Sequence, residues 1–196
     1  LFHVVDFLDF YRANPVQIAL LTEGGLSVYG GIVGGVVAGA LYIWWKKLGV
    51  RRLLDSAAPA LILAQPVGRL GCLSNGDAWG APADLPWSVV YTHPSDLIRH
   101  DLLNVATHPY PAYEIVWDIA LFIVLWQLKP KNLPGGVLFL AYAALYSLGR
   151  IILTSVRQES VAFAGLQQAQ VVALAILVAS VVGLVVVMVR RRAING

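Results

Sequence analysis

The sequence predicts an all-α fold, a polytopic membrane helix bundle with about five transmembrane helices. Hydrophobic residues make up 58% of the 196 residues and charged residues only 13%, whereas a soluble domain carries roughly 25% charged residues. The mean hydropathy is +0.71. The apolar residues gather into long segments separated by short polar ones, which is the pattern of membrane-spanning helices. We expect residues 1–196 to form a single transmembrane domain.

Each of the five apolar segments is long enough to cross a bilayer. They contain roughly 17 to 22 residues, which at ~1.5 Å per residue span roughly 25 to 33 Å. The third segment is the shortest, so it needs a thinner bilayer or side chains that reach outward from its ends. The segments are residues 26–45, 53–73, 112–128, 134–153 and 168–189.

Basic residues follow the first, third and fifth segments, which five crossings place on the same side of the membrane. Loops rich in lysine and arginine stay in the cytoplasm. The N-terminus is therefore predicted outside and the C-terminus in the cytoplasm. The clusters are Lys46, Lys47, Arg51 and Arg52; Lys129 and Lys131; and Arg190, Arg191 and Arg192.

The irregular parts of the chain fall on the predicted outer side. Residues 1–25 mix charged and apolar residues and are expected to form an interfacial arm, or in part a sixth span. Residues 76–111 form the long outer loop, with five prolines and three of the four histidines.

Arg69 is the most informative polar residue, because it ends an apolar segment inside the glycine-rich run at residues 67–77. A guanidinium keeps its proton, and holding it at membrane depth costs about 2.5 kcal/mol or more. An anion is therefore expected to compensate it. Two partners stay open: a phospholipid phosphate, or a structural ion pair with Glu114 or Asp118.

Polar residues from four spans fall at the same depth as Arg69 and predict a polar cavity open to the outer face. Some also have simpler structural interpretations, such as packing for Cys72, close helix contact for Gly30 and Gly31, and interfacial anchoring for Arg157. The set is Glu23, Tyr29, Arg69, Cys72, Asn75, His108, Tyr113, Glu114, Asp118, Arg150, Thr154 and Arg157.

The motifs exclude several other kinds of site. No grouping of histidine, cysteine and carboxylate has metal-ligand spacing, and the sequence contains no nucleotide-binding loop or hydrolase elbow. It therefore predicts neither a metal site nor a cofactor. The net charge of +3 is divided among short clusters, which indicates membrane topology and no nucleic acid partner.

Four sequence blocks occur in an informative order. They are EGGLSVYGG at residues 23–31, GRLGCLSNGDAWG at residues 68–80, HPYPAYE at residues 108–114, and residues 146–157, which contain Arg150. In order and spacing these blocks resemble the prolipoprotein diacylglyceryl transferase family. The resemblance covers nearly the whole chain.

The resemblance implies transfer of a diacylglyceryl group from phosphatidylglycerol to the lipobox cysteine of a prolipoprotein, with release of glycerol 1-phosphate. It also implies a multi-pass protein of the bacterial plasma (inner) membrane that binds phosphatidylglycerol or another anionic phospholipid and the prolipoprotein signal peptide. The implied catalytic residues are Arg69, Arg150, Glu114 and Asp77. The implied substrate-binding residues are Tyr29, Gly30, Gly31, Cys72, Asn75, Gly76, Gly80, His108, Tyr113 and Arg157.

The chain departs from the family pattern at positions whose side chains could transfer a proton or bind an arginine. Tyr29 replaces a histidine, Cys72 an asparagine, and Thr154 a carboxylate. Asp77 and Asp118 replace glutamates, and a span that precedes the first block in the family is not evident. The proton acceptor stays open among Glu114, Asp77 and His108. An alternative function is a non-catalytic, phospholipid-binding subunit of a larger membrane complex.

Overall fold

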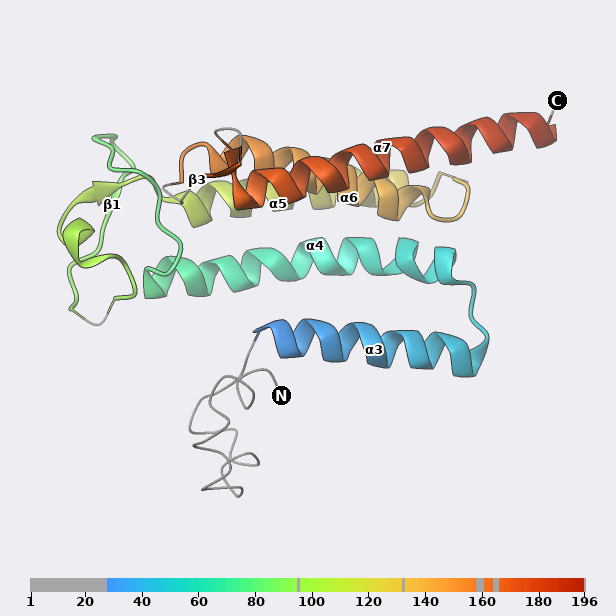
Figure 1. Ribbon diagram of the computed structural model, residues 1–196, viewed down its shortest axis with the longest axis horizontal. Helices are drawn as coiled ribbons and strands as arrows, with labels where there is room; N and C mark the ends of the chain where they lie inside the picture. The colour runs from blue at the N-terminus through green and yellow to red at the C-terminus, as the bar shows by residue number, and fades with distance from the viewer. Residues whose placement is uncertain (1–27, 95, 132, 158–160, 164–165, 196) are drawn as a thin grey trace, which may run out of the picture. The chain divides into compact units, whose positions relative to one another are not determined.

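The structure is a computed structural model that describes residues 28–94, 96–131, 133–157, 161–163 and 166–195 (Figure 1). The predicted arm at residues 1–25, including Glu23, lies outside the described residues. By their contacts, residues Leu1–Val50 and Arg51–Gly196 form two compact units. The expectation of a single transmembrane domain stays a prediction.

Each of the five apolar segments overlaps one α-helix of the described residues. The helices are α3 (Val28–Lys46), α4 (Val50–Asn75), α5 (Tyr110–Leu128), α6 (Val137–Thr154) and α7 (Gln168–Asn195). Three of them, α5, α6 and α7, are long and apolar enough to cross a membrane. The helical character is confirmed, while the number of crossings and the orientation stay predictions.

Helix α3 belongs to the first unit and ends where its apolar run meets two lysines. Lys47, the residue after the helix, has a positive φ of 51°. Trp44 and Trp45 are exposed, and Lys46 Nζ lies 4.4 Å from the centroid of the Trp45 ring. Tryptophan beside lysine at a helix end is typical of a membrane–water interface.

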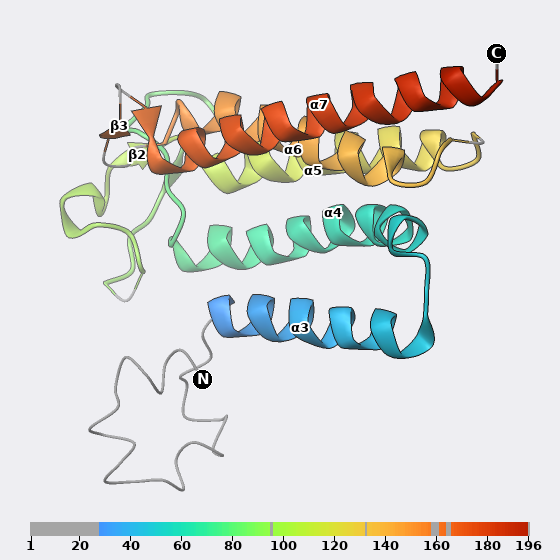
Figure 2. The same ribbon diagram turned by 45° about the vertical axis from the view of Figure 1, so that its right-hand side comes forward.

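In the second unit, α5, α6 and α7 lie side by side in both views (Figures 1 and 2). Helix α4 packs on α5 and α6 through a cluster of buried aliphatic side chains: Ile62, Leu121, Leu125 and Leu138. A hydrogen bond from Gln65 Nε2 to the Tyr142 hydroxyl, 2.9 Å long, adds a polar link between α4 and α6.

One carboxylate joins α4 to the beginning of α6. Asp55 accepts a hydrogen bond of 2.6 Å from the Gly136 amide and one of 2.9 Å from the Phe139 amide. The first N–H groups of a helix have no partner within the helix, so a carboxylate satisfies them well. Gly136 has a φ of 96°, which favours glycine. Asp55 therefore fixes how the α5–α6 connection meets α4.

Two small sheets correct the all-α expectation to a mostly helical one. Strands β1 (Val89–Val90) and β2 (Ala106–Thr107) pair antiparallel within the predicted outer loop. Strands β3 (Val161–Phe163) and β4 (Leu166–Gln167) pair antiparallel before α7. Such short strands carry no alternating pattern long enough to be recognised from sequence.

The predicted outer loop has a hydrophobic core of its own. Tyr91, Ile98 and Leu102 are buried together, and Leu102 ends a 3-10 turn at His100–Leu102. Helix α5 begins at Tyr110 with Pro111 in its first turn, so the loop ends earlier than the predicted residue 111. Proline is tolerated there, because the first helical amides have no partner within the helix.

Candidate functional site

Two arginines from different helices meet at one buried carboxylate. Arg69 lies near the end of α4 and Arg150 near the end of α6, while Glu114 lies in the first turns of α5. Arg69 Nε is 2.6 Å from Glu114 Oε2, and its Nη2 donates to Oε1 at 3.1 Å. Arg150 Nη1 donates to the same Oε1 at 2.5 Å. The ion pair between Arg69 and Glu114 that the sequence left open is therefore present.

Tyr110 completes this cluster from the first turn of α5. Its hydroxyl donates to Glu114 Oε1 at 2.9 Å and accepts from Arg150 Nη1 at 2.8 Å. Tyr110 is fully buried, and the guanidinium of Arg157 lies 5.3 Å from its ring centroid. A third predicted arginine thus borders the cluster and lies over the Tyr110 ring.

Close packing of α5 on α6 brings Glu114 and Arg150 together. The Trp117 indole Nε1 donates to the Leu145 carbonyl at 3.3 Å. A Cβ atom at Gly149 would lie 2.1 Å from the same nitrogen. The indole therefore occupies the space that any side chain at position 149 would need. Arg150 is the next residue in the sequence, so this close packing of α5 on α6 lies beside the arginine cluster.

Cys72 of α4 and Asp77, which follows the end of α4 by two residues, extend the cluster. Arg69 Nη1 approaches Cys72 Sγ at 3.8 Å, and the Asp77 carboxylate interacts with the same thiol. Asp77 is exposed, in contrast to Glu114. The structure thus connects Arg69 to Asp77 through Cys72.

A second group of hydrogen bonds lies at the start of α5. Tyr113 accepts at its hydroxyl from Trp87 Nε1 at 2.9 Å, and His108 Nδ1 lies 3.1 Å from the same oxygen. The Gly80 amide donates to the His108 carbonyl at 3.2 Å. A Cβ atom at Gly80 would lie 2.6 Å from His108 Cβ, so Gly80 makes room for His108.

Asn75 and Gly76 end α4 and join it to the loop core. Gly76 has a φ of 69° and would place a Cβ atom 3.1 Å from the Tyr91 ring. The Asn75 carbonyl accepts from the Leu97 amide at 2.9 Å. Tyr91 donates to the Leu73 carbonyl at 3.1 Å, and burial raises the pKa of Tyr91. The phenol therefore remains a hydrogen-bond donor around neutral pH.

The remaining predicted residues belong to the first unit. Tyr29, Gly30 and Gly31 lie in the first turn of α3, and their side chains fall outside the description. Their predicted contact with a head group stays a prediction.

Tyr110 and Trp87 are members of these two groups that the sequence did not single out. Tyr110 could have been predicted from the sequence, because it precedes Glu114 by four residues and therefore lies on the same helix face. Trp87 could not have been predicted, since it lies 26 residues from its partner Tyr113 in a loop without a periodic pattern.

The cluster at Glu114 has the features of an anion site. Two guanidiniums against one carboxylate leave a local charge of about +1 when Asp118 is left aside. The side chain of Arg69 is 23% exposed and that of Arg150 is 18% exposed. Within the described part of the chain, Arg150 uses only Nη1 in its hydrogen bonds, so Nε and Nη2 remain for a ligand such as phosphate.

Comparisons with known proteins agree with the resemblance. The family model described as prolipoprotein diacylglyceryl transferase matches residues 1–186. The phosphatidylglycerol–prolipoprotein diacylglyceryl transferase of Thermosynechococcus vestitus is 36% identical over 177 residues, which are 89% of this chain and 65% of that protein. Proteins of the same name from Nostoc sp. and Clostridium novyi are each 33% identical, over 98% and 93% of this chain. The chain spans 65% to 70% of the length of these relatives.

Proposed function

The chain belongs to the prolipoprotein diacylglyceryl transferase family, and we propose that it transfers a diacylglyceryl group from phosphatidylglycerol to a prolipoprotein cysteine. A carbon–sulfur bond forms between the thiol sulfur and the glyceryl carbon. The bond from that carbon to the phosphate oxygen breaks, and glycerol 1-phosphate leaves with the bonding electrons. The thiol proton passes to a base.

The convergence of Arg69 and Arg150 on Glu114 is the observation that carries this proposal. The leaving phosphate gains negative charge in the transition state, and guanidiniums held in place before the reaction stabilise that charge. Arginine suits phosphate because its planar fork donates two parallel hydrogen bonds. Glu114 holds both forks, and the partial exposure of the arginines leaves each accessible to the lipid.

We assign the proton acceptor to His108, because the carboxylates of Glu114 and Asp77 serve other contacts. Glu114 Oε1 accepts three hydrogen bonds, and Oε2 is in contact with Arg69. When His108 Nδ1 donates to the Tyr113 oxygen, Nε2 keeps a lone pair for the thiol proton. Replacement of His108 by glutamine should then lower transfer while phosphatidylglycerol binding persists.

The proposed location is the bacterial plasma membrane, with several crossings and the arginine cluster facing the outer leaflet. The apolar helices α5, α6 and α7 support a membrane location. The basic residues at the opposite helix ends support the orientation. The proposed partners are phosphatidylglycerol, the prolipoprotein signal peptide and the surrounding bilayer, while association with other membrane subunits remains a prediction.

A transfer assay tests the proposal. The purified chain is incubated with phosphatidylglycerol and a lipobox peptide, and the peptide mass is measured. A diacylglyceryl mass shift that disappears in Arg69→Ala is the expected result. The matched control is Arg99→Ala, because Arg99 is 54% exposed on the loop and pairs only with exposed Asp101 among the described residues; it should keep full activity.

The same assay separates the enzyme from the alternative function. The substitutions at Tyr29 and Thr154 favour a lipid-binding subunit that no longer transfers. Bound phosphatidylglycerol without any peptide mass shift would support that alternative and reject the transferase. A mass far above 21.2 kDa after extraction in mild detergent would then identify a complex.

A further inference from the structure

A cationic cavity lies at the opposite ends of the helices from Glu114. Its volume is about 460 Å³, and it is formed by the beginning of α4, the turn before α6 and the end of α7. Three of its lining residues are arginines from two helices. The lining is Arg51, Pro134, Gly135, Val186, Val187, Arg190 and Arg191.

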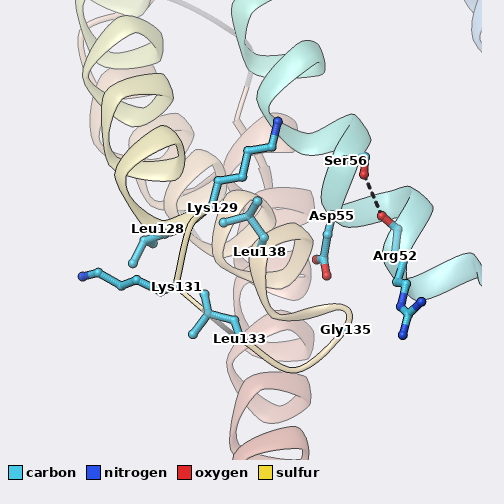
Figure 3. Close-up of a pocket in the computed structure, with 9 residues that line it drawn as sticks. All are labelled: Arg52, Asp55, Ser56, Leu128, Lys129, Lys131, Leu133, Gly135 and Leu138. Atoms are coloured by element: carbon cyan, nitrogen blue, oxygen red, sulfur yellow. Dashed lines mark hydrogen bonds between the residues drawn. The ribbon is translucent and has the colours of Figure 1, made fainter.

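Among the described residues, no carboxylate pairs with the arginines of this cavity. No acidic side chain of that part of the chain lines it, and the ion pairs found there involve only Arg69, Arg150 and Arg99. The adjacent cavity of about 410 Å³ differs, because it includes Asp55. Figure 3 shows that Arg52 and Lys131 of that adjacent cavity point away from each other. The three-arginine cavity therefore has the stronger positive potential for a single anion.

Part of the lining of the three-arginine cavity is apolar, and this apolar surface continues along α7. Val186 and Val187 of α7 line it together with Pro134. Farther along α7, Val182 and Val185 are exposed by more than half of their surface. A ligand that combines an anionic group with hydrocarbon chains matches this arrangement, whereas a free anion would use only the arginines.

The turn that carries Gly135 is fixed from the α4 side. A Cβ atom at Gly135 would lie 3.3 Å from Arg51 Cβ, so the turn packs closely on the stem of this arginine. The hydrogen bonds from Gly136 and Phe139 to Asp55 hold the same turn. One wall of the cavity is thus positioned before any ligand binds.

This cavity is separate from the arginine cluster at Glu114. Arg51 and Arg69 lie 18 positions apart on α4, which corresponds to about 27 Å along a helix. The basic residues place Arg51 on the predicted cytoplasmic side, and Arg69 lies toward the other face. A lipid in the three-arginine cavity therefore belongs to the opposite leaflet from the proposed substrate.

We propose that Arg51, Arg190 and Arg191 bind the phosphate of an anionic phospholipid from the cytoplasmic leaflet, with its acyl chains along α7. The site is independent of the proposed transfer reaction. The lipid joins the start of α4 to the end of α7, two segments far apart in the sequence.

The experiment counts lipid molecules retained by the full chain. The protein in neutral detergent is titrated with dioleoyl phosphatidic acid, and bound lipid is counted by native mass spectrometry. The double variant R51Q/R191Q should bind this lipid about 25-fold more weakly at one site, since each arginine near an anionic lipid head group contributes about a fivefold gain. A second site at Arg69 and Arg150 should keep its occupancy.

The matched control is R52Q/R192Q, which removes the same charge from the same two helices. Arg52 lines the adjacent cavity and Arg192 lines neither, so this variant should bind within about twofold of the unmodified chain. Circular dichroism and gel filtration verify that both variants fold. If R51Q/R191Q does not fold, R51K/R191K retains the charge and should show a smaller loss from its missing guanidinium forks.

Four results would overturn the proposal. An equal loss in the two glutamine pairs would mean that only the net charge matters, and unchanged binding in R51Q/R191Q would exclude the cavity. Equal retention of dioleoylglycerol, which lacks the phosphate, would show apolar adhesion. Displacement by inorganic phosphate at the same concentrations as lipid would assign the site to a free anion.

Discussion

At each end of α4 a carboxylate joins two or more helices. The two contacts differ in how many hydrogen-bond donors they leave available to a ligand. At one end Glu114 of α5 binds Arg69 of α4 and Arg150 of α6. At the other end Asp55 of α4 binds the amides of Gly136, just before α6, and of Phe139 in its first turn. Both carboxylates tie helices together across long stretches of sequence.

The difference lies in the donors. A backbone amide has a single hydrogen, so Asp55 uses all that Gly136 and Phe139 offer. A guanidinium has five donors, so Arg69 and Arg150 keep some after binding Glu114. The contact at Asp55 is therefore structural, whereas the contact at Glu114 both holds the helices and presents cations to a ligand. Substitutions at the two ends should separate stability from function.

Glu114→Gln should have the largest effect, because it leaves two guanidiniums facing each other without their carboxylate. Breaking such a buried pair costs about 3 to 5 kcal/mol, so thermal unfolding in detergent should occur at a clearly lower temperature. The exposed Asp101→Asn serves as the control and should unfold at the temperature of the unmodified chain. Unchanged unfolding of Glu114→Gln would contradict the holding role of this carboxylate.

Arg150→Lys should separate charge from geometry at the same end. Lysine keeps the positive charge but lacks the planar fork, so the donors aimed at the phosphate are lost. The transfer rate should fall by about 10², while the unfolding temperature changes less than in Glu114→Gln. Arg99→Lys, on the exposed loop, should leave the rate unchanged. A rate in Arg150→Lys close to that of the unmodified chain would show that charge alone is sufficient.

Asp55→Asn tests the other end. The amide of asparagine can accept one of the two backbone hydrogen bonds, so the chain should lose about 1 to 2 kcal/mol of stability. The transfer rate per folded molecule should remain within about twofold, because Asp55 is remote from the arginine cluster. Ser56→Ala is the neighbouring control, since within the described ranges the Ser56 hydroxyl bonds only the Arg52 carbonyl of its own helix. A selective loss of rate in Asp55→Asn would place functional coupling at this end too.

Tyr110→Phe should have the smallest effect, because it removes one hydroxyl and keeps the ring. The hydroxyl bridges Arg150 and Glu114, but these two side chains also bind each other directly, so the net loss should be about 0.5 to 1 kcal/mol. The ring that Arg157 covers persists. Chemical unfolding should show this modest loss, and Tyr42→Phe on exposed α3 should show none. A loss as large as that of Glu114→Gln would mean that Tyr110 organises the whole cluster.

Much of the helical structure could be predicted from the sequence. Apolar segments of this length have few alternatives to a helix in a membrane, because every backbone amide and carbonyl must find a partner inside the segment. The small strands of the outer loop could not be predicted, since Val89 and Thr107 pair across 18 residues without a local pattern. The beginning of α5 was misplaced by two residues, because prolines flank Tyr110.

The sequence by itself identified Arg69 as a cation at membrane depth that needs an anion, and the ordered blocks of residues placed the chain near one family. Only the tertiary structure decided that Arg69 and Arg150 share Glu114, and that Asp55 caps α6. These contacts join residues 36 to 84 positions apart. Their formation depends on how each helix rotates and which neighbour it packs on, and hydropathy and spacing within one segment do not specify either.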